Sequence, residues 1–151
     1  MPRENIIMLS VSPTYARAIM SGAKSVELRR RAPRIPDGTS AWLYSTLPVG
    51  EVVALLRIET VVEAPVAELW ERYSGRASIP KAAFDHYFTG LGSGAALIIR
   101  DVQALKKPIS LEEMRQHGAF HPPQFYRRVA EDAAGRRLAS SELCPPVQLV
   151  A

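Results

Sequence analysis

The chain has a single cysteine, Cys144, so it cannot form an internal disulfide, as is typical of proteins from reducing compartments. No stretch approaches the roughly 20 apolar residues that a membrane-spanning helix needs. The first five residues lack the pattern of a signal peptide. We therefore expect a cytoplasmic protein that has no membrane among its partners.

Aromatic residues make up only 7% of the chain, but 47% of its 151 residues are hydrophobic, enough for the core of one ordinary domain. The sequence shows no internal repeat and no low-complexity tract. The net charge is +4, and the basic residues gather in two groups, within residues 24–34 and 127–137. Groups this dense attract phosphates, although on many proteins they are only solvated surface.

A predicted helix leads directly into a predicted strand near the N-terminus. Ser12 can cap a helix over residues 13–21, and Pro13 fits the first turn of that helix. Gly22 suits the position just after a helix, where a positive φ is common. From residue 25 to residue 31 the hydrophobic pattern changes to a period of two, which is typical of a strand.

The corner between this helix and strand concentrates charged side chains that could form a binding or catalytic site. Lys24 precedes the strand, and Glu27, Arg29 and Arg31 alternate with apolar residues along it. Lysine beside a carboxylate can hold a phosphate or carbonyl oxygen, or act in proton transfer if it is desolvated. The alternative is an ordinary charged strand face with one wet side. On a regular strand Lys24 and Glu27 would face opposite sides, so they converge only if Lys24 lies before the strand or a bulge intervenes.

Two later segments offer further candidates. Trp42 and Tyr44 share one face of a predicted strand over residues 41–46, where they could stack on bases or fill the core. Gln124 and Tyr126 follow Pro122-Pro123 and could line a cleft, or merely pack at the start of a short helix within residues 122–130.

The remaining pattern predicts an α+β fold with five to six strands and inserted and flanking helices. Further strands are expected at residues 5–11, 51–62 and 95–105, with Pro108 ending the last. Helices are expected at residues 64–73 and 79–88, separated by a loop at residues 74–78, and after Ser110, which stands at capping-box spacing from Glu113. Short strands with Gly and Pro turns favour a small β-barrel, and an open mixed sheet is the alternative.

His117 and His121 stand at the spacing of helical zinc ligands, but Gly118 interrupts the helix and no third ligand is near. The sequence therefore predicts no metal site, and it contains no motif that implies a cofactor.

The charged corner also carries a family resemblance. Gly22-x-Lys24-x-x-Glu27-x-Arg29 resembles the G-x-K-x-x-E-x-R signature of ASCH domains, a branch of the PUA-like superfamily. The segment Leu9–Ala16 resembles the strand and helix that precede this signature, and Pro122–Arg127 resembles a second segment of some bacterial and archaeal members. The resemblance implies a PUA-like barrel and an ASCH domain over residues 1–130, followed by a C-terminal extension over residues 131–151.

The resemblance also implies functions. Some small ASCH proteins are amidohydrolases that deacetylate N4-acetylcytidine, but they have threonine, their proposed nucleophile, where this chain has Glu27. Other members bind or cleave RNA. Our first hypothesis is a protein that binds RNA or a nucleotide-like ligand in a basic cleft. The alternative is a hydrolase acting on a modified nucleoside or on RNA, with Lys24 and Glu27 as acid/base pair. A regulatory or protein-interaction module is the third option.

Overall fold

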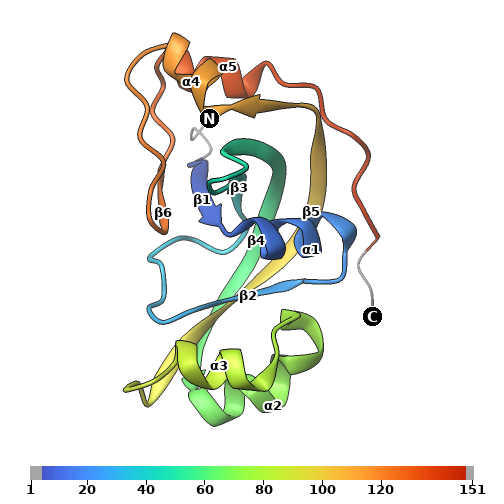
Figure 1. The fold of residues 1–151 in the computed structure, drawn as a ribbon, viewed down its shortest axis with the longest axis vertical. Coiled ribbons are helices and arrows are strands. Elements are labelled where there is room, and N and C mark those ends of the chain that lie inside the picture. The colour runs from blue at the N-terminus through green and yellow to red at the C-terminus, as the bar shows by residue number, and fades with distance from the viewer. Residues whose placement is uncertain (1–4, 149–151) are drawn as a thin grey trace.

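The computed structural model describes residues 5–148 and shows a six-stranded sheet with five helices (Figure 1). The strands are β1 (Ile7–Val11), β2 (Val26–Arg29), β3 (Thr39–Ser45), β4 (Glu51–Pro65), β5 (Ser93–Ser110) and β6 (Tyr126–Arg128). The helices are α1 (Pro13–Ser21), α2 (Val66–Ala77), α3 (Lys81–Tyr87), α4 (Leu111–Gln116) and α5 (Ala133–Ala139).

The strand order is β2-β5-β4-β3-β1-β6. Only β1 and β3 pair in parallel, while the other neighbouring strands are antiparallel. The predicted α+β class and the number of strands are therefore confirmed. In the described part of the chain no pairing joins the two edge strands β2 and β6, so a closed barrel is not confirmed.

The long hairpin of β4 and β5 connects the two ends of the molecule. Its register shifts at three points, and such bulges increase the local twist and bend a strand. Helices α2 and α3 connect the two strands at one end of the molecule, and α4 follows β5 at the opposite end, where α5 also lies (Figure 1). Each end has its own cluster of buried hydrophobic residues, and a third cluster lies between α1 and the middle of the sheet.

The predicted junction of helix and strand is present. Pro13 is the first residue of α1, and Gly22 follows the helix with φ of 85°, so its backbone N–H reaches the carbonyl of Ile19. Ser12 occupies the cap position, but its side chain makes no capping hydrogen bond. Strand β2 begins at Val26, and therefore Lys24 precedes the strand.

Three local predictions are wrong. Helix α2 continues to Ala77 through the segment expected to be a loop, and it contributes Tyr73 and Ala77 to the core. Strand β5 passes Pro108 and ends at Ser110. Residues 126–128 form β6 on β1, not a helix, because the edge of β1 offers backbone partners to this segment.

Residues 131–148 pack against the rest of the molecule. Helix α5 places Ala134 and Leu138 in the same hydrophobic cluster as Met8 of β1. Val147 contacts the central cluster, and its N–H donates to the carbonyl of Val102 at 2.8 Å. None of the helices within residues 5–148 has the length and apolar character required to cross a membrane.

Candidate functional site

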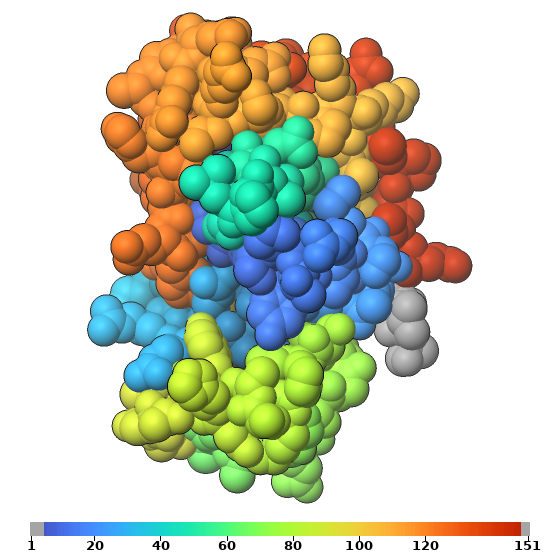
Figure 2. All heavy atoms as spheres, in the orientation of Figure 1, coloured from blue at the N-terminus to red at the C-terminus, as the bar shows by residue number. Residues whose placement is uncertain are grey.

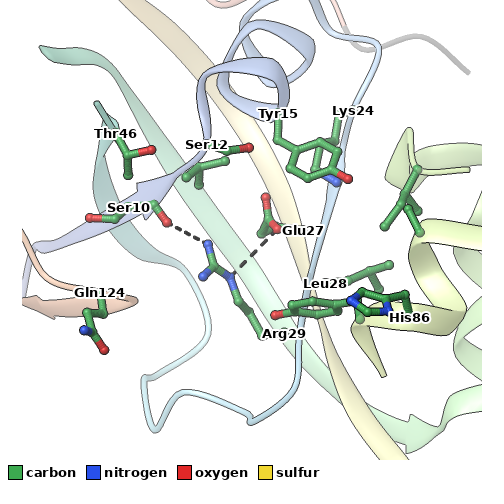
Figure 3. A pocket seen from close by; sticks show the side chains of 14 residues that line it. Ser10, Ser12, Tyr15, Lys24, Glu27, Leu28, Arg29, Thr46, His86 and Gln124 are labelled. Atoms are coloured by element: carbon green, nitrogen blue, oxygen red, sulfur yellow. Dashed lines mark hydrogen bonds and ion pairs between the residues drawn. The ribbon is translucent and has the colours of Figure 1, made fainter. Parts of the chain in front are cut away.

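A cavity of about 410 Å³ opens where β1, α1 and β2 meet the segment from α2 to α3 (Figure 3). Its walls combine apolar side chains with a small set of polar and charged groups. The lining residues are Ser10, Val11, Ser12, Tyr15, Lys24, Glu27, Leu28, Arg29, Thr46, Ile79, Ala83, His86, Tyr87 and Gln124. A concave, mainly apolar pocket with a few convergent polar groups is the usual form of a ligand site.

Lys24 is almost fully buried, with 2% of its surface exposed. Its ammonium donates to the carbonyl of Ala77 at the C-terminal end of α2, where the helix dipole favours a cation. Nζ also lies 4.6 Å from the centroid of the Tyr15 ring. Burial lowers the pKa of Lys24 from its ordinary value, and the nearby Arg29 adds to this effect, while Glu27 opposes it.

Glu27 and Arg29 project from β2 to the same side as the cavity. Nε of Arg29 lies 3.8 Å from Oε1 of Glu27, and Nη2 of Arg29 donates to the carbonyl of Ser10 at 2.7 Å. The guanidinium also stacks on Phe125, with Cζ 4.5 Å from the ring centroid. Figure 3 shows Glu27 between Arg29 and the pair of Tyr15 and Lys24. The order of charge along this wall is therefore positive, negative, positive.

Three buried polar atoms around the cavity have no hydrogen-bond partner. Within residues 5–148 they are the buried side-chain nitrogen and oxygen atoms left without one, namely Oγ of Ser10, Oε2 of Glu27 and Nε of Arg29. All three residues line the same cavity. Leaving a buried polar group unpaired costs about 1–3 kcal/mol, so three such residues on one cavity mark a site where a ligand can supply partners.

Two tyrosines line the cavity, Tyr15 from α1 and Tyr87 from α3. Burial raises the pKa of both Tyr15 and Tyr87 above the ordinary value of 10.0, and the Glu27 carboxylate contributes to the rise at Tyr15. Both phenols therefore stay neutral at physiological pH and can donate a hydrogen bond.

Of the residues predicted from sequence, Lys24, Glu27, Arg29 and Gln124 line the cavity. Lys24 converges with Glu27 because it precedes β2 and is not bound by the alternation of the strand. Arg31 is exposed beyond the end of β2 and does not line the cavity.

The structure places the predicted aromatic residues elsewhere. Trp42 and Tyr44 have only 4% and 3% of their surface exposed, and both pack in the cluster beneath α4 and α5. This agrees with the core-filling alternative, and neither residue lines the cavity. Tyr126 is half-buried, and its hydroxyl accepts a hydrogen bond from the backbone N–H of Arg34 at 3.2 Å. It supports the segment between β2 and β3 and does not line the cavity.

No local sequence signal identified the wall formed by Ile79, Ala83, His86 and Tyr87. These residues are far from the charged corner in the chain, and they reach the cavity because α2 and α3 share a hydrophobic cluster with β2. Tyr15 could have been included from sequence, because it lies on the helix directly before the motif.

The arrangement can bind a planar polar ligand and can support proton transfer. The carboxylate of Glu27 is a hydrogen-bond acceptor or a base, Arg29 is a fixed donor, and Lys24 can donate or exchange a proton. Within residues 5–148 no group of three or more His, Cys, Asp or Glu side chains lies in an arrangement that could hold a metal ion.

Comparison with known proteins gives one clear relationship. The chain matches no family model. It is 36% identical over 124 residues to a protein of Zymomonas mobilis subsp. mobilis named ASCH domain-containing ribonuclease, covering 82% of this chain and 83% of the relative. The crystal structure of ASCH from Zymomonas mobilis superposes with a TM-score of 0.84 at 30% identity, covering 92% of this chain and 97% of the other.

A more distant neighbour shares the fold alone. Human THYN1 protein, solved in complex with DNA containing 5-methylcytosine, superposes with a TM-score of 0.52 at 11% identity, covering 89% of this chain and 96% of the other. The similarity to the Zymomonas protein extends over most of both chains. It points to the same family as the motif containing Lys24, Glu27 and Arg29. This chain belongs to the ASCH domain family.

Proposed function

We propose that this protein binds single-stranded RNA and accepts one nucleotide of the strand in the cavity, with the base inside. The observation that carries the proposal is that Ser10, Glu27 and Arg29, which each hold a buried polar atom without a hydrogen-bond partner, line one cavity. The wall offers both an acceptor and a donor, and the edge of every nucleobase presents the complementary groups. The relative named a ribonuclease supports RNA as the class of ligand.

The size and the lining of the cavity suit a nucleotide. Its volume of about 410 Å³ lies within the range of about 300–1,000 Å³ typical of small-ligand sites. Tyr15 and Tyr87 provide ring surfaces, and Leu28 and Ile79 provide aliphatic ones. Stacking on an aromatic ring contributes about 1–3 kcal/mol per base in single-strand binding.

Glu27 decides the orientation of the nucleotide. A phosphate placed against the unpaired carboxylate oxygen would bring two anions together in a water-poor site, which is strongly unfavourable. An amino or imino N–H of a base would instead satisfy that oxygen. Therefore the base enters the cavity, and the phosphates remain at its mouth.

Calorimetric titration tests this orientation. The probes are neutral ribonucleosides, their 5′-monophosphates and inorganic phosphate, measured with wild type and with Glu27→Gln. We expect wild type to bind a nucleoside, and the variant to bind it about tenfold or more weakly, as befits loss of a charge-assisted hydrogen bond. Glu59→Gln is the matched control, because Glu59 is exposed and pairs with Arg100 away from the cavity.

Binding of a short single-stranded RNA completes this test. Its affinity should fall as the salt concentration rises, because the phosphates outside the cavity release counterions on binding. If neither nucleosides nor RNA bind wild type, or if Glu27→Gln and Glu59→Gln behave alike, the proposal is rejected.

RNA cleavage is a second candidate function. Two specific observations favour it: the lowered pKa of Lys24 beside a carboxylate, and the similarity to a relative named a ribonuclease. In this reaction Glu27 would remove the proton of a ribose 2′-hydroxyl, and the 2′-oxygen would attack phosphorus. The bond from phosphorus to the 5′-oxygen would break, and that oxygen would take a proton from Lys24. The products are a 2′,3′-cyclic phosphate and a 5′-hydroxyl end.

Cleavage requires the sugar and phosphate, not the base, to lie against Glu27, so the two candidates predict different results. Incubation with RNA followed by analysis of the ends should reveal cyclic phosphate, which Glu27→Gln should abolish and Glu59→Gln should leave unchanged. RNA with a 2′-deoxy substitution at the cleaved position should resist. N4-acetylcytidine serves as the comparison substrate, and its deacetylation would point to an amidohydrolase. Intact RNA with purified wild type would exclude ribonuclease activity.

A further inference from the structure

The turn between β3 and β4 displays apolar side chains to solvent next to the cavity. Within residues 5–148 the exposed large hydrophobic residues are Leu47, with 71% of its surface exposed, and Val49, with 39%. Both belong to this one turn. It stands at the surface on the face shown in Figure 2, where it is teal and lies directly beside the blue segment of β1 and α1.

The conformation of the turn is fixed by backbone hydrogen bonds. The N–H groups of Val49 and Gly50 donate to the carbonyl of Thr46 at 3.1 and 3.3 Å. Gly50 has φ of 61°, and a Cβ there would lie 3.0 Å from Cδ2 of Leu47. The carbonyl of Gly50 accepts from the N–H of Leu111 at 2.9 Å, which ties the turn to α4. The exposed side chains therefore stand on a rigid support.

The same turn continues the wall of the cavity. Thr46 lines the cavity, and its N–H donates to the carbonyl of Val11, another lining residue, at 3.0 Å. Leu47 is the next residue along the chain. Consequently, the apolar tip begins one residue beyond the cavity wall.

We propose that Leu47 and Val49 form a platform for the nucleotide next to the one held in the cavity. This inference rests on the proposed function. A base that enters the cavity leaves its neighbour without a stacking partner, and apolar side chains commonly replace such a partner in nucleic-acid complexes. An exposed apolar pair on a rigid turn, continuous with a cavity that takes the base, has the position and chemistry for that role.

The test uses a variant that removes the apolar surface and one that keeps it. Leu47→Ser/Val49→Ser makes the tip polar, whereas Leu47→Met/Val49→Ile preserves its apolar area. Both pairs change exposed positions, so the fold should be retained, and thermal unfolding checks this. The probes are a ribonucleoside, which reaches only the cavity, and a short RNA with 2-aminopurine beside the nucleotide that enters it.

We expect the serine variant to bind the RNA about tenfold more weakly than wild type and to bind the nucleoside equally well. The change in 2-aminopurine fluorescence on binding should also disappear in this variant, while the methionine and isoleucine variant should behave like wild type. Unchanged RNA affinity in the serine variant, with nucleoside binding intact in wild type, overturns the platform alone. Absence of nucleoside and RNA binding in wild type overturns the proposed function as well.

A second copy of the chain is the competing occupant of this tip. Sedimentation of wild type and of the serine variant distinguishes it. A wild-type dimer that the serine variant converts to a monomer would overturn the platform in favour of self-association, whereas a monomer in both agrees with it.

Discussion

Nε of Arg29 and Oε1 of Glu27 face each other across a gap of 3.8 Å, wide enough to weaken their direct contact but narrow enough to keep the charges paired. The two groups come from alternate positions of one short strand, so the sheet fixes their separation. A ligand edge that offers a donor beside an acceptor can bind both at once.

Replacing Arg29 by lysine should weaken ligand binding even though the positive charge remains. The planar guanidinium uses Nη2 for the Ser10 carbonyl, places Nε 3.8 Å from the Glu27 carboxylate and stacks on Phe125. An ammonium group cannot reproduce this geometry. We expect Arg29→Lys to bind nucleosides about tenfold more weakly, measured by calorimetry. Arg57→Lys is the control, since Arg57 also donates to a backbone carbonyl but is exposed away from the cavity. Equal losses in both variants would contradict the prediction.

Lys24 should give the protein a specific dependence of stability on pH. Burial lowers the pKa of Lys24 in the folded state below its ordinary value of 10.5, so the unfolded chain binds this proton more tightly. Between the folded pKa and 10.5 the unfolded state therefore holds more protons, and the free energy of unfolding contributed by Lys24 rises with pH.

Urea unfolding of wild type and Lys24→Met across the alkaline range measures this contribution. We expect the difference, wild type minus variant, to increase as the pH rises toward 10.5. The comparison by difference is necessary because the raised pKa values of Tyr15 and Tyr87 lower stability above pH 10.0 in both proteins. A difference that stays constant or falls would contradict the prediction.

Trp42 should affect stability and not binding. Its ring is buried in the cluster that includes Met8 and Leu105, on no wall of the cavity. Trp42→Phe leaves a partial void there, so we expect the free energy of unfolding to fall by about 1–3 kcal/mol. The affinity of the folded protein for nucleosides should be unchanged. If fully folded Trp42→Phe bound nucleosides more weakly than wild type, Trp42 would belong to the binding site.

Ser110 should stabilise the start of α4. Its hydroxyl accepts a hydrogen bond from the backbone N–H of Glu113 at 3.0 Å, as the capping-box spacing predicts. We expect Ser110→Ala to lower the free energy of unfolding by about 1 kcal/mol, measured by urea unfolding. Ser110→Asp, which can still accept that hydrogen bond, should retain the stability of wild type. A neutral effect of the alanine change would show that the cap contributes nothing here.

Local sequence signals were reliable where they describe a single element. Pro13 and Gly22 delimit α1, Ser110 begins α4, and the period-two pattern marks β2. The signature containing Lys24, Glu27 and Arg29 indicated the family, which the comparisons confirm. These features depend on interactions between residues close together in the chain.

Predictions failed where a distant segment changed the outcome. Residues 126–128 became a strand because β1 had a free edge, and Pro108 was accommodated within β5 because the hairpin with β4 continues beyond it. Neither partner can be recognised from the local sequence. The open sheet likewise follows from the order of strands, which periodicity does not encode.

The sequence by itself determined the charged corner and its order of residues, since a helix end, a glycine and a strand follow from short-range sterics and hydrogen bonding. Only the tertiary structure decided that this corner becomes one wall of a cavity, that His86 and Tyr87 form another wall, and that Trp42 and Tyr44 are buried elsewhere. The physical reason is that a cavity is created by packing between elements. Its shape and the burial of its charges depend on which surfaces meet, and contacts between residues far apart in the chain settle that.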